Sequence, residues 1–400
     1  MNSNSKEIEN DLHTVDWDFK GEETTNLTHG IHPYPAKFIP QIPANLIERL
    51  SEPGDTVYDP FVGSGTTMVE ATLSGRGALG TDVNPLSVLL SRVKSTPLSK
   101  DQLGQVDSVL SDIRDEINAL YGQRSITNYG EASEVGDYEE FIPDYKKLDF
   151  WFEDFIVDEL AVIKKNIHSV DDRELRDFLR IAMSAIIISV SNQDSETRYT
   201  SRDKDLSEQD AFRKFENKAT KMTRVMEEYS SRAGNVEKPD VRVADARELD
   251  FLEDENKEID LVVTSPPYPN ALSYHLYHRN RLVWLDFDYK ELKPKEIGSH
   301  RKYSKKEGGA TAETFLTEMV DCLSKITNAL SSGGYCAFVI GDSIIDGEVV
   351  ENNEIIKDAG REAGLELFTE INRTIDAQSK NVNPEIGSIK EEHIVVLQKP

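Results

Sequence analysis

Residues 56–94, "TVYDPFVGSGTTMVEATLSGRGALGTDVNPLSVLLSRVK", carry two alternating patterns that decide the fold. Short apolar runs at 56–59 and 78–82 predict strands, and amphipathic stretches at 66–73 and 85–94 predict helices. A strand, helix, strand, helix order makes the strands parallel, because a helical crossover returns the chain to the same end of the sheet. We therefore predict an α/β fold.

The alternation stops near residue 99 and resumes near residue 240. The intervening segment carries long helical patterns such as "FEDFIVDELAVIKKNI" and "LRDFLRIAMSAIIISVS", with a polar linker at 122–137. Beyond it, "VRVADA", "EIDLVVT", "GGYCAFVIGD" and two terminal segments predict strands, and 274–285 predicts one helix. We predict a doubly wound, Rossmann-like α/β sheet that has a mainly helical insertion. Its parts are a loosely ordered lead-in at 1–28, the domain of the sheet at 29–99 and 240–400, and the insertion at 100–239.

Composition excludes several classes of protein. The net charge of −27 argues against a generally basic nucleic-acid binder, so any such surface must be local, as in the basic segment 270–306. No apolar run is long enough for a membrane helix, and the polar, acidic N-terminus does not resemble a signal peptide. Cys322 and Cys336 are too few for a disulfide framework or a zinc site, so we expect core residues in a cytoplasmic protein.

The stretch "DLVVTSPPYP" at 260–269 begins as a buried strand and then breaks its own pattern. Neither Pro266 nor Pro267 can donate a ladder hydrogen bond, and each proline fixes its own φ. The strand must therefore end in one rigid shape. We expect the backbone carbonyls of Ser265 and Pro266 to be free to face a ligand.

The turn "DPFVGSGTT" at 59–67 lies between a strand and a helix, where Gly63 and Gly65 let the backbone approach a ligand. A phosphate-binding P-loop would need a lysine before the threonines, and none is present. Asp82 ends the next strand, about 20 residues on, where an acidic side chain can accept hydrogen bonds from both ribose hydroxyls. The alternative for Asp82 is a turn or helix cap.

Three motifs together resemble the S-adenosylmethionine-dependent amino methyltransferases of DNA. These are "DPFVGSGTT" as the cofactor loop, "TSPPY" as the catalytic motif and "HPYPAKFIP" as a segment that covers the methionine end of the cofactor. The resemblance implies catalytic roles for Ser265, Pro266, Pro267 and Tyr268. It implies cofactor-binding roles for Asp59, Phe61, Gly63, Gly65, Thr66, Asp82, Asp245, Lys37 and Phe38, with no metal.

The resemblance also implies a mechanism. S-adenosylmethionine is the cofactor, and the target base is flipped from the DNA duplex into a pocket where Tyr268 offers a stacking face. Within this resemblance Asp245 meets the adenine amino group, with a turn-forming aspartate as the alternative. Lys37 belongs to the covering segment, with a surface lysine as the alternative.

The motif's first residue bears on the substrate. In this family Ser265 favours the 4-amino group of cytosine, whereas an aspartate or asparagine there favours the 6-amino group of adenine. Adenine, an RNA amine, a protein amide and a non-catalytic subunit that retains the fold stay open as alternatives. Methylation of cytosine carbon 5 is disfavoured, because it needs a cysteine nucleophile in a Pro-Cys pair and neither cysteine follows a proline.

Other features suggest recognition and partners. In the family such an insertion often reads the target sequence, so Arg198, Arg202 and Lys204 are expected to reach DNA, unless they are only the solvated exit of a core helix. His275 and His278 share a helix face, and we favour the base pocket or core packing over a metal. A cognate restriction or phage-defence system is the partner that the resemblance implies.

Overall fold

The protein is described by a computed structural model that covers residues 3–126, 137–196, 198–234, 236–304, 309–375 and 391–400. Most of the linker predicted at 122–137 lies outside these ranges, as do residues 305 and 306 of the basic segment. Gly122, at the start of that linker, belongs instead to helix α6 (Val106–Ile126).

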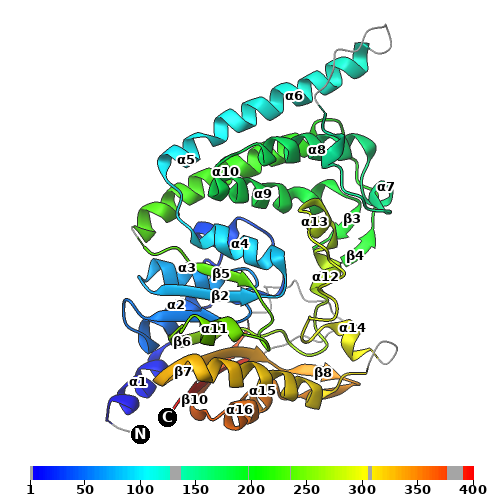
Figure 1. The fold of residues 1–400 in the computed structure, drawn as a ribbon. Coiled ribbons are helices and arrows are strands. Elements are labelled where there is room, and N and C mark those ends of the chain that lie inside the picture. The colour runs from blue at the N-terminus through cyan, green and yellow to red at the C-terminus, as the bar shows by residue number, and fades with distance from the viewer. Residues whose placement is uncertain (1–2, 127–136, 197, 235, 305–308, 376–390) are drawn as a thin grey trace.

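A seven-stranded sheet in the order β10-β11-β7-β6-β1-β2-β5 forms the centre of the molecule (Figure 1). Strands β5, β2, β1, β6 and β7 are parallel. Strand β11 pairs antiparallel with β7, and β10 pairs antiparallel with β11, so β10 runs in the same direction as the five parallel strands. The strands are β1 (Thr56–Asp59), β2 (Gly77–Asp82), β5 (Asp240–Val243), β6 (Ile259–Thr264), β7 (Leu330–Gly341), β10 (Glu366–Thr374) and β11 (Glu391–Gln398). This arrangement confirms the predicted doubly wound α/β fold.

Strand β1 marks the point where the strand order reverses. The chain continues from β1 to β2 on one side, and β6 pairs with β1 on the other. In open α/β sheets, ligands bind outside the carboxyl ends of the strands at such a point. The topology therefore directs attention to the loops that follow β1, β2 and β6.

Helices cover both faces of the sheet because successive strand residues point to opposite sides. Val57 packs into one apolar cluster with α1, α2 and α3, whereas Tyr58 packs into another with α15 and α16. Cys322 and Cys336 are buried in the second cluster, which confirms the prediction that both are core residues. These helices are α1 (Ser3–Thr14), α2 (Gln41–Leu50), α3 (Thr66–Leu73), α11 (Asp250–Asp254), α15 (Ala312–Ala329) and α16 (Asn352–Glu362).

The segment between β2 and β5 forms a helical layer beyond one edge of the sheet (Figure 1). Its apolar core is shared with helix α4 (Pro85–Ser95) and with helix α13 (Arg279–Trp284). The layer comprises α5 (Lys100–Gly104), α6, α7 (Leu148–Trp151), α8 (Asp154–His168), α9 (Arg173–Ile186), the hairpin β3 (Gln193–Ser195) and β4 (Arg198–Ser201), and α10 (Asp210–Ala233). The shared core attaches this layer to the sheet domain.

The prediction of a loosely ordered lead-in at 1–28 is wrong. Helix α1 lies there, and Leu12 and Trp17 are both buried. The Trp17 indole N–H donates to the Leu12 carbonyl at 2.8 Å, and the Trp17 carbonyl accepts from Arg373 Nε of β10 at 2.9 Å. Because the segment is mostly polar, the sequence did not indicate that Leu12 and Trp17 would be buried. Both residues pack in an apolar cluster that exists only once the sheet has formed.

The single helix expected at 274–285 is also corrected. Two short helices, α12 (Tyr274–Tyr277) and α13, meet at His278, whose φ of −95° and ψ of 3° interrupt the helical geometry. That region of φ/ψ space is sparsely populated and is typical of tight turns. None of the helices in the described part of the chain has the length and apolarity needed to span a membrane.

Candidate functional site

The carboxyl ends of β1 and β6 are joined directly by side chains. Thr264 Oγ1, at the end of β6, donates to Asp59 Oδ1, at the end of β1, over 2.6 Å. Thr67 Oγ1, at the start of α3, donates to the Val263 carbonyl at 3.1 Å. The glycine turn and the motif that starts at Ser265 therefore lie at one edge of the sheet, although about 200 residues separate them.

The glycine turn adopts a conformation that favours glycine. Gly63 and Gly65 have φ values of 46° and 80°, in the left-handed region. A Cβ atom on Gly65 would lie 2.7 Å from the Ser91 Cα atom, so Gly65 also permits close packing of the turn against α4. Helix α3 begins at the next residue, and its first N–H groups face this edge.

Asp82 is fixed by two backbone groups. Its Oδ2 accepts from the Gly63 N–H at 3.0 Å, and its Oδ1 accepts from the Asn84 N–H at 2.8 Å. Burial raises the pKa of Asp82 to about 7, and the nearby Asp59 carboxylate adds to that rise. Each carboxylate oxygen can accept a further hydrogen bond. A desolvated carboxylate with spare acceptor sites fits the two hydroxyls of a ribose.

Asp59 is enclosed more completely, with 1% of its surface exposed. Burial raises its pKa to about 6, and this rise is opposed by hydrogen bonds from the Thr264 hydroxyl and the Phe61 N–H. The structure therefore places Asp59 where it links the two loops. This linking position was not evident from the sequence, and Thr264 was not among the predicted site residues.

The Ser265–Tyr268 motif follows β6 without any further strand pairing in the described residues. Gly298, in the loop before α14 (His300–Tyr303), lies directly behind the motif with a φ of 72°. A Cβ atom on Gly298 would be 2.5 Å from the Tyr268 carbonyl oxygen and 3.1 Å from that of Pro267. Sequence analysis could place the segment that begins with Gly298 beside the site from its glycine, but it could not assign this residue a role.

The 296–301 segment holds the loop that follows the motif. Glu296 accepts from the His275 backbone N–H at 2.5 Å and pairs with His275 Nδ1 at 2.7 Å. The Ser299 and Ser273 hydroxyls are 2.9 Å apart, and the Gly298 carbonyl accepts from the Ala271 N–H at 3.2 Å. The motif is therefore supported from behind by a second loop.

Two lysines connect the backbone at His29, just before the covering segment, to that segment and to the cofactor loop. Lys37 Nζ donates to the His29 carbonyl at 2.9 Å, and the fully buried Lys94 Nζ donates to the Ser64 carbonyl at 2.9 Å and lies 3.4 Å from the His29 carbonyl. Tyr34, not Phe38, approaches the glycine turn, and a Cβ atom on Gly63 would be 3.5 Å from the Tyr34 ring. Phe38 packs against the core cluster of α1 and α2.

The remaining residues predicted to bind the cofactor are Asp245, Phe61 and Thr66, and each contacts different neighbours. The Asp245 carboxylate is already paired with Arg247, at 2.8 Å from Nε and 2.6 Å from Nη2. Phe61 packs partly buried against the cluster that contains Tyr58. The buried Thr66 hydroxyl lies 3.0 Å from the Ser64 hydroxyl. Asp245 could therefore bind an amino group only by sharing its carboxylate with Arg247.

His278 lies in an aromatic cluster with Tyr34 and Tyr274. Its ring centroid is 5.0 Å from that of Tyr34 and 6.0 Å from that of Tyr274. Burial lowers the pKa of His278 to about 3, so the imidazole is neutral near pH 7. His275 instead pairs with Glu296, so the two histidines face different partners.

Several cations of the basic segment stabilise the fold. Arg281 is fully buried, donates to the Ser184 carbonyl and pairs with Glu196 at 2.6 Å. The Arg279 guanidinium lies over the rings of Tyr199 and Tyr289, 4.8 and 4.7 Å from their centroids. These two arginines therefore attach α13 to the helical layer and are not part of an exposed basic surface.

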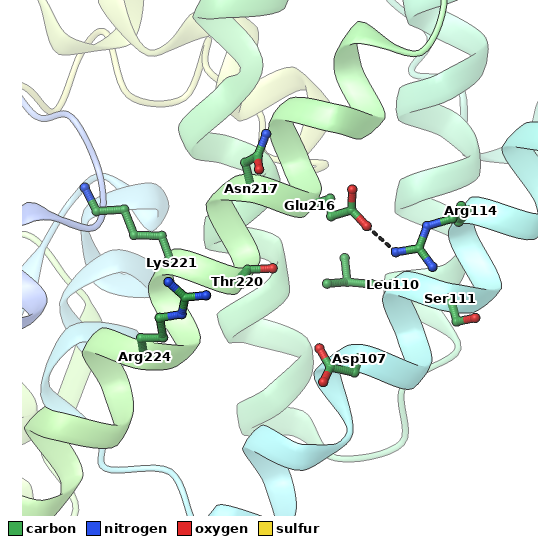
Figure 2. A pocket seen from close by; sticks show the side chains of 9 residues that line it. All are labelled: Asp107, Leu110, Ser111, Arg114, Glu216, Asn217, Thr220, Lys221 and Arg224. Carbon is green, nitrogen blue, oxygen red and sulfur yellow. Dashed lines mark hydrogen bonds and ion pairs between the residues drawn. The ribbon is translucent and has the colours of Figure 1, made fainter.

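A groove of about 580 Å³ lies away from this edge, between α6 and α10. Figure 2 shows Glu216 paired with Arg114 across the groove, and Lys221 and Arg224 on α10. The other residues lining it are Asp107, Leu110, Ser111, Asn217 and Thr220. This groove belongs to the helical layer, and none of its lining residues belongs to the strand-edge site.

Comparison with known proteins bears on the site. A family model described as DNA methylase matches residues 2–90, which include the covering segment and the cofactor loop. A type II methyltransferase of Kocuria varians, M.MvaI, is 29% identical over 298 residues, 67% of this chain and 60% of the relative. Another, M.MjaII of Methanocaldococcus jannaschii, is 33% identical over 144 residues, 35% of this chain and 26% of the relative.

These similarities support the N4/N6 DNA amino methyltransferase family for this chain. The similarity implies S-adenosylmethionine as the methyl donor, and the environment of Asp82 fits its ribose. The chain spans less than two thirds of the length of these two relatives. The solved structure of an rRNA methyltransferase from Streptomyces viridochromogenes aligns with 92% of this chain and 88% of its own, at 12% identity and a TM-score of 0.35.

The Asp82→Ala variant is expected to bind S-adenosylmethionine more weakly by roughly 1.5 to 3 kcal/mol, because it loses a charged hydrogen-bond acceptor. Calorimetric titration measures this difference. Asp55→Ala is the matched control, because its carboxylate caps a turn at the opposite end of β1. An unchanged affinity in Asp82→Ala would leave Asp82 with a structural role only.

The raised pKa of Asp82 adds a pH dependence to the same titration. Below about pH 7 the carboxyl group holds a proton, which removes the charged acceptor that the ribose needs. Wild-type affinity should therefore increase as the pH rises through 7 and then level off. Asp82→Ala should show no such increase.

Proposed function

We propose that this chain transfers a methyl group from S-adenosylmethionine to an exocyclic amino group of DNA, namely N4 of cytosine. The observation that carries the proposal is the Thr264–Asp59 hydrogen bond, which brings the Ser265–Tyr268 motif beside the glycine turn. Ser265 as the first motif residue supports cytosine over adenine. The relatives named above are type II methyltransferases, which supports DNA as the substrate.

The motif suits an amine that is a poor nucleophile. The lone pair of an exocyclic amine is delocalised into the ring, so the nitrogen must rehybridise as it attacks. Pro266 and Pro267 have no N–H groups, and in our proposal the Ser265 and Pro266 carbonyls accept the hydrogens of the amine. The Ser265 hydroxyl oxygen provides a further acceptor. Rigid acceptors favour reaction because a misplaced one loses the near-attack geometry.

Tyr268 provides the stacking surface for the flipped base in this proposal. Burial, together with the nearby Glu392 carboxylate, raises the pKa of its hydroxyl well above the usual range, so the ring stays neutral. S-adenosylmethionine, when bound, supplies an electrophilic methyl group. Asp82 and the glycine turn orient its ribose and methionine ends, and Tyr34 and Lys37 belong to the segment that covers them.

We also assign a share of DNA recognition to the β3–β4 hairpin. The side chains of Arg198 and Arg202 are 69% and 73% exposed, with only distant pairing to Asp194 at 3.8 and 3.7 Å. Lys204, in contrast, donates to the Ile188 carbonyl and stabilises the hairpin's base. A restriction nuclease that recognises the same DNA sequence is the partner that we propose.

Incubation of the purified chain with unmethylated duplex DNA and radiolabelled S-adenosylmethionine tests the proposal. Nucleoside digestion and mass spectrometry are expected to find 4-methylcytosine. Label in 6-methyladenine would retain the mechanism and overturn the inference from Ser265. Label only in RNA or protein would show that the site was identified correctly and the substrate wrongly. Cofactor binding without transfer would support a non-catalytic subunit.

A further inference from the structure

The hydroxyl of Tyr268 is bonded to a residue from the far end of the chain. It donates to Glu392 Oε1 on β11 at 3.2 Å, across 124 positions of sequence. Glu392 lies opposite Gly341 of β7 in the strand ladder, and Tyr268 follows the neighbouring strand β6. The carboxylate therefore reaches the ring from the adjacent part of the same sheet.

Glu392 is itself held by an arginine. Its Oε2 accepts from Arg373 Nη1 on β10, its partner in the ladder, and the two side chains are only 14% and 7% exposed. Arg373 Nε in turn donates to the Trp17 carbonyl at 2.9 Å. The two oxygens of Glu392 thus have separate partners, one structural and one in the catalytic motif.

We propose that Glu392, oriented by Arg373, is a positioning residue that holds the ring of Tyr268 in the place required for stacking of the target base. The proposal rests on the proposed function. A tyrosine ring held only by packing can swing about its Cα–Cβ bond, whereas a hydroxyl tethered at the far end of the ring restricts that movement and keeps the ring in one place. The Arg373–Trp17 contact makes the N-terminal segment part of this support.

The Glu392→Gln variant separates the two oxygens of the side chain. Its amide oxygen is expected to keep accepting from the cationic Arg373, which leaves only the neutral NH2 group for Tyr268, so the hydroxyl loses its charged acceptor. The matched control is Glu391→Gln, which removes the same charge from the neighbouring, exposed position of β11. Glu392→Asp is a second variant that keeps the ion pair's charge and shortens the reach to Tyr268 if the glutamine variant folds poorly.

The first measurement is independent of activity. The chain has 14 tyrosines, so labelling with 3-fluorotyrosine gives a fluorine NMR spectrum in which Tyr268→Phe identifies the Tyr268 signal. Glu392→Gln and Glu392→Asp are expected to shift and broaden that signal, whereas Glu391→Gln leaves it in place. An unmoved Tyr268 signal in both Glu392 variants would overturn the proposal.

The second measurement is turnover on unmethylated duplex DNA. Glu392→Gln and Tyr268→Phe are each expected to lower kcat roughly tenfold with an unchanged KM for S-adenosylmethionine, because stacking geometry affects the reacting amine and not the cofactor. The double variant should be no slower than either single variant. If the fall in kcat of the double variant equals the product of the two single falls, Glu392 and Tyr268 do not act through a shared contact. If the wild-type protein methylates no nucleic acid but the Tyr268 signal shifts in the Glu392 variants, the proposed function is wrong and the contact between Tyr268 and Glu392 is still supported.

Discussion

Tyr268→Ala is expected to lower turnover about a hundredfold while leaving S-adenosylmethionine affinity unchanged. Stacking of a base on an aromatic ring contributes roughly 1 to 3 kcal/mol, and loss of the near-attack geometry adds to that cost. Single-turnover methylation of duplex DNA and calorimetric titration of the cofactor measure the two quantities. Because Tyr268 is outside the Asp82 and glycine-turn contacts, only the first should change.

A stability control accompanies this variant. Tyr335→Ala removes a tyrosine in the middle of β7, where its ring packs on Phe368 at a centroid distance of 5.0 Å. It is expected to lower the melting temperature and to retain turnover per folded molecule. Full turnover in Tyr268→Ala would remove the catalytic assignment of the motif.

Gly298→Ala is expected to lower turnover by roughly a hundredfold, because small displacements of reacting groups have effects of that size. The added Cβ would lie 2.5 Å from the Tyr268 carbonyl oxygen, which is closer than van der Waals contact permits. Either Gly298 or the Pro267–Tyr268 backbone must move. The displaced carbonyl belongs to the motif that we propose orients the amine.

The control for Gly298→Ala is Gly75→Ala. Gly75 has a φ of 74°, against 72° for Gly298, and a Cβ there would meet nothing within 4 Å. Both variants therefore place an alanine at nearly the same positive φ, and only Gly298→Ala has the collision. Turnover is expected to fall in Gly298→Ala alone. Equal losses in both variants would attribute the effect to general destabilisation.

The local pattern of the sequence was sufficient to predict most of the sheet. The strand at 56–59 and the helix at 66–73 appear within the predicted bounds, because apolar periodicity and the glycine turn act over a few residues. The α1 helix was missed because Leu12 and Trp17 are isolated apolar residues in a polar segment. The break at His278 was missed for a similar reason, since its turn depends on burial among residues distant in sequence.

For the site, the sequence by itself determined which chemical groups stand at strand ends: two glycines, Asp82 and a Ser-Pro-Pro-Tyr motif. These are local properties, because proline and glycine restrict or extend the backbone wherever they occur. Only the tertiary structure decided their support, through Thr264 on Asp59, Gly298 behind Tyr268 and Glu392 on its hydroxyl. Each of these contacts joins residues that are at least 30 positions apart. They depend on the strand order, which brings the carboxyl ends together and which no local pattern encodes.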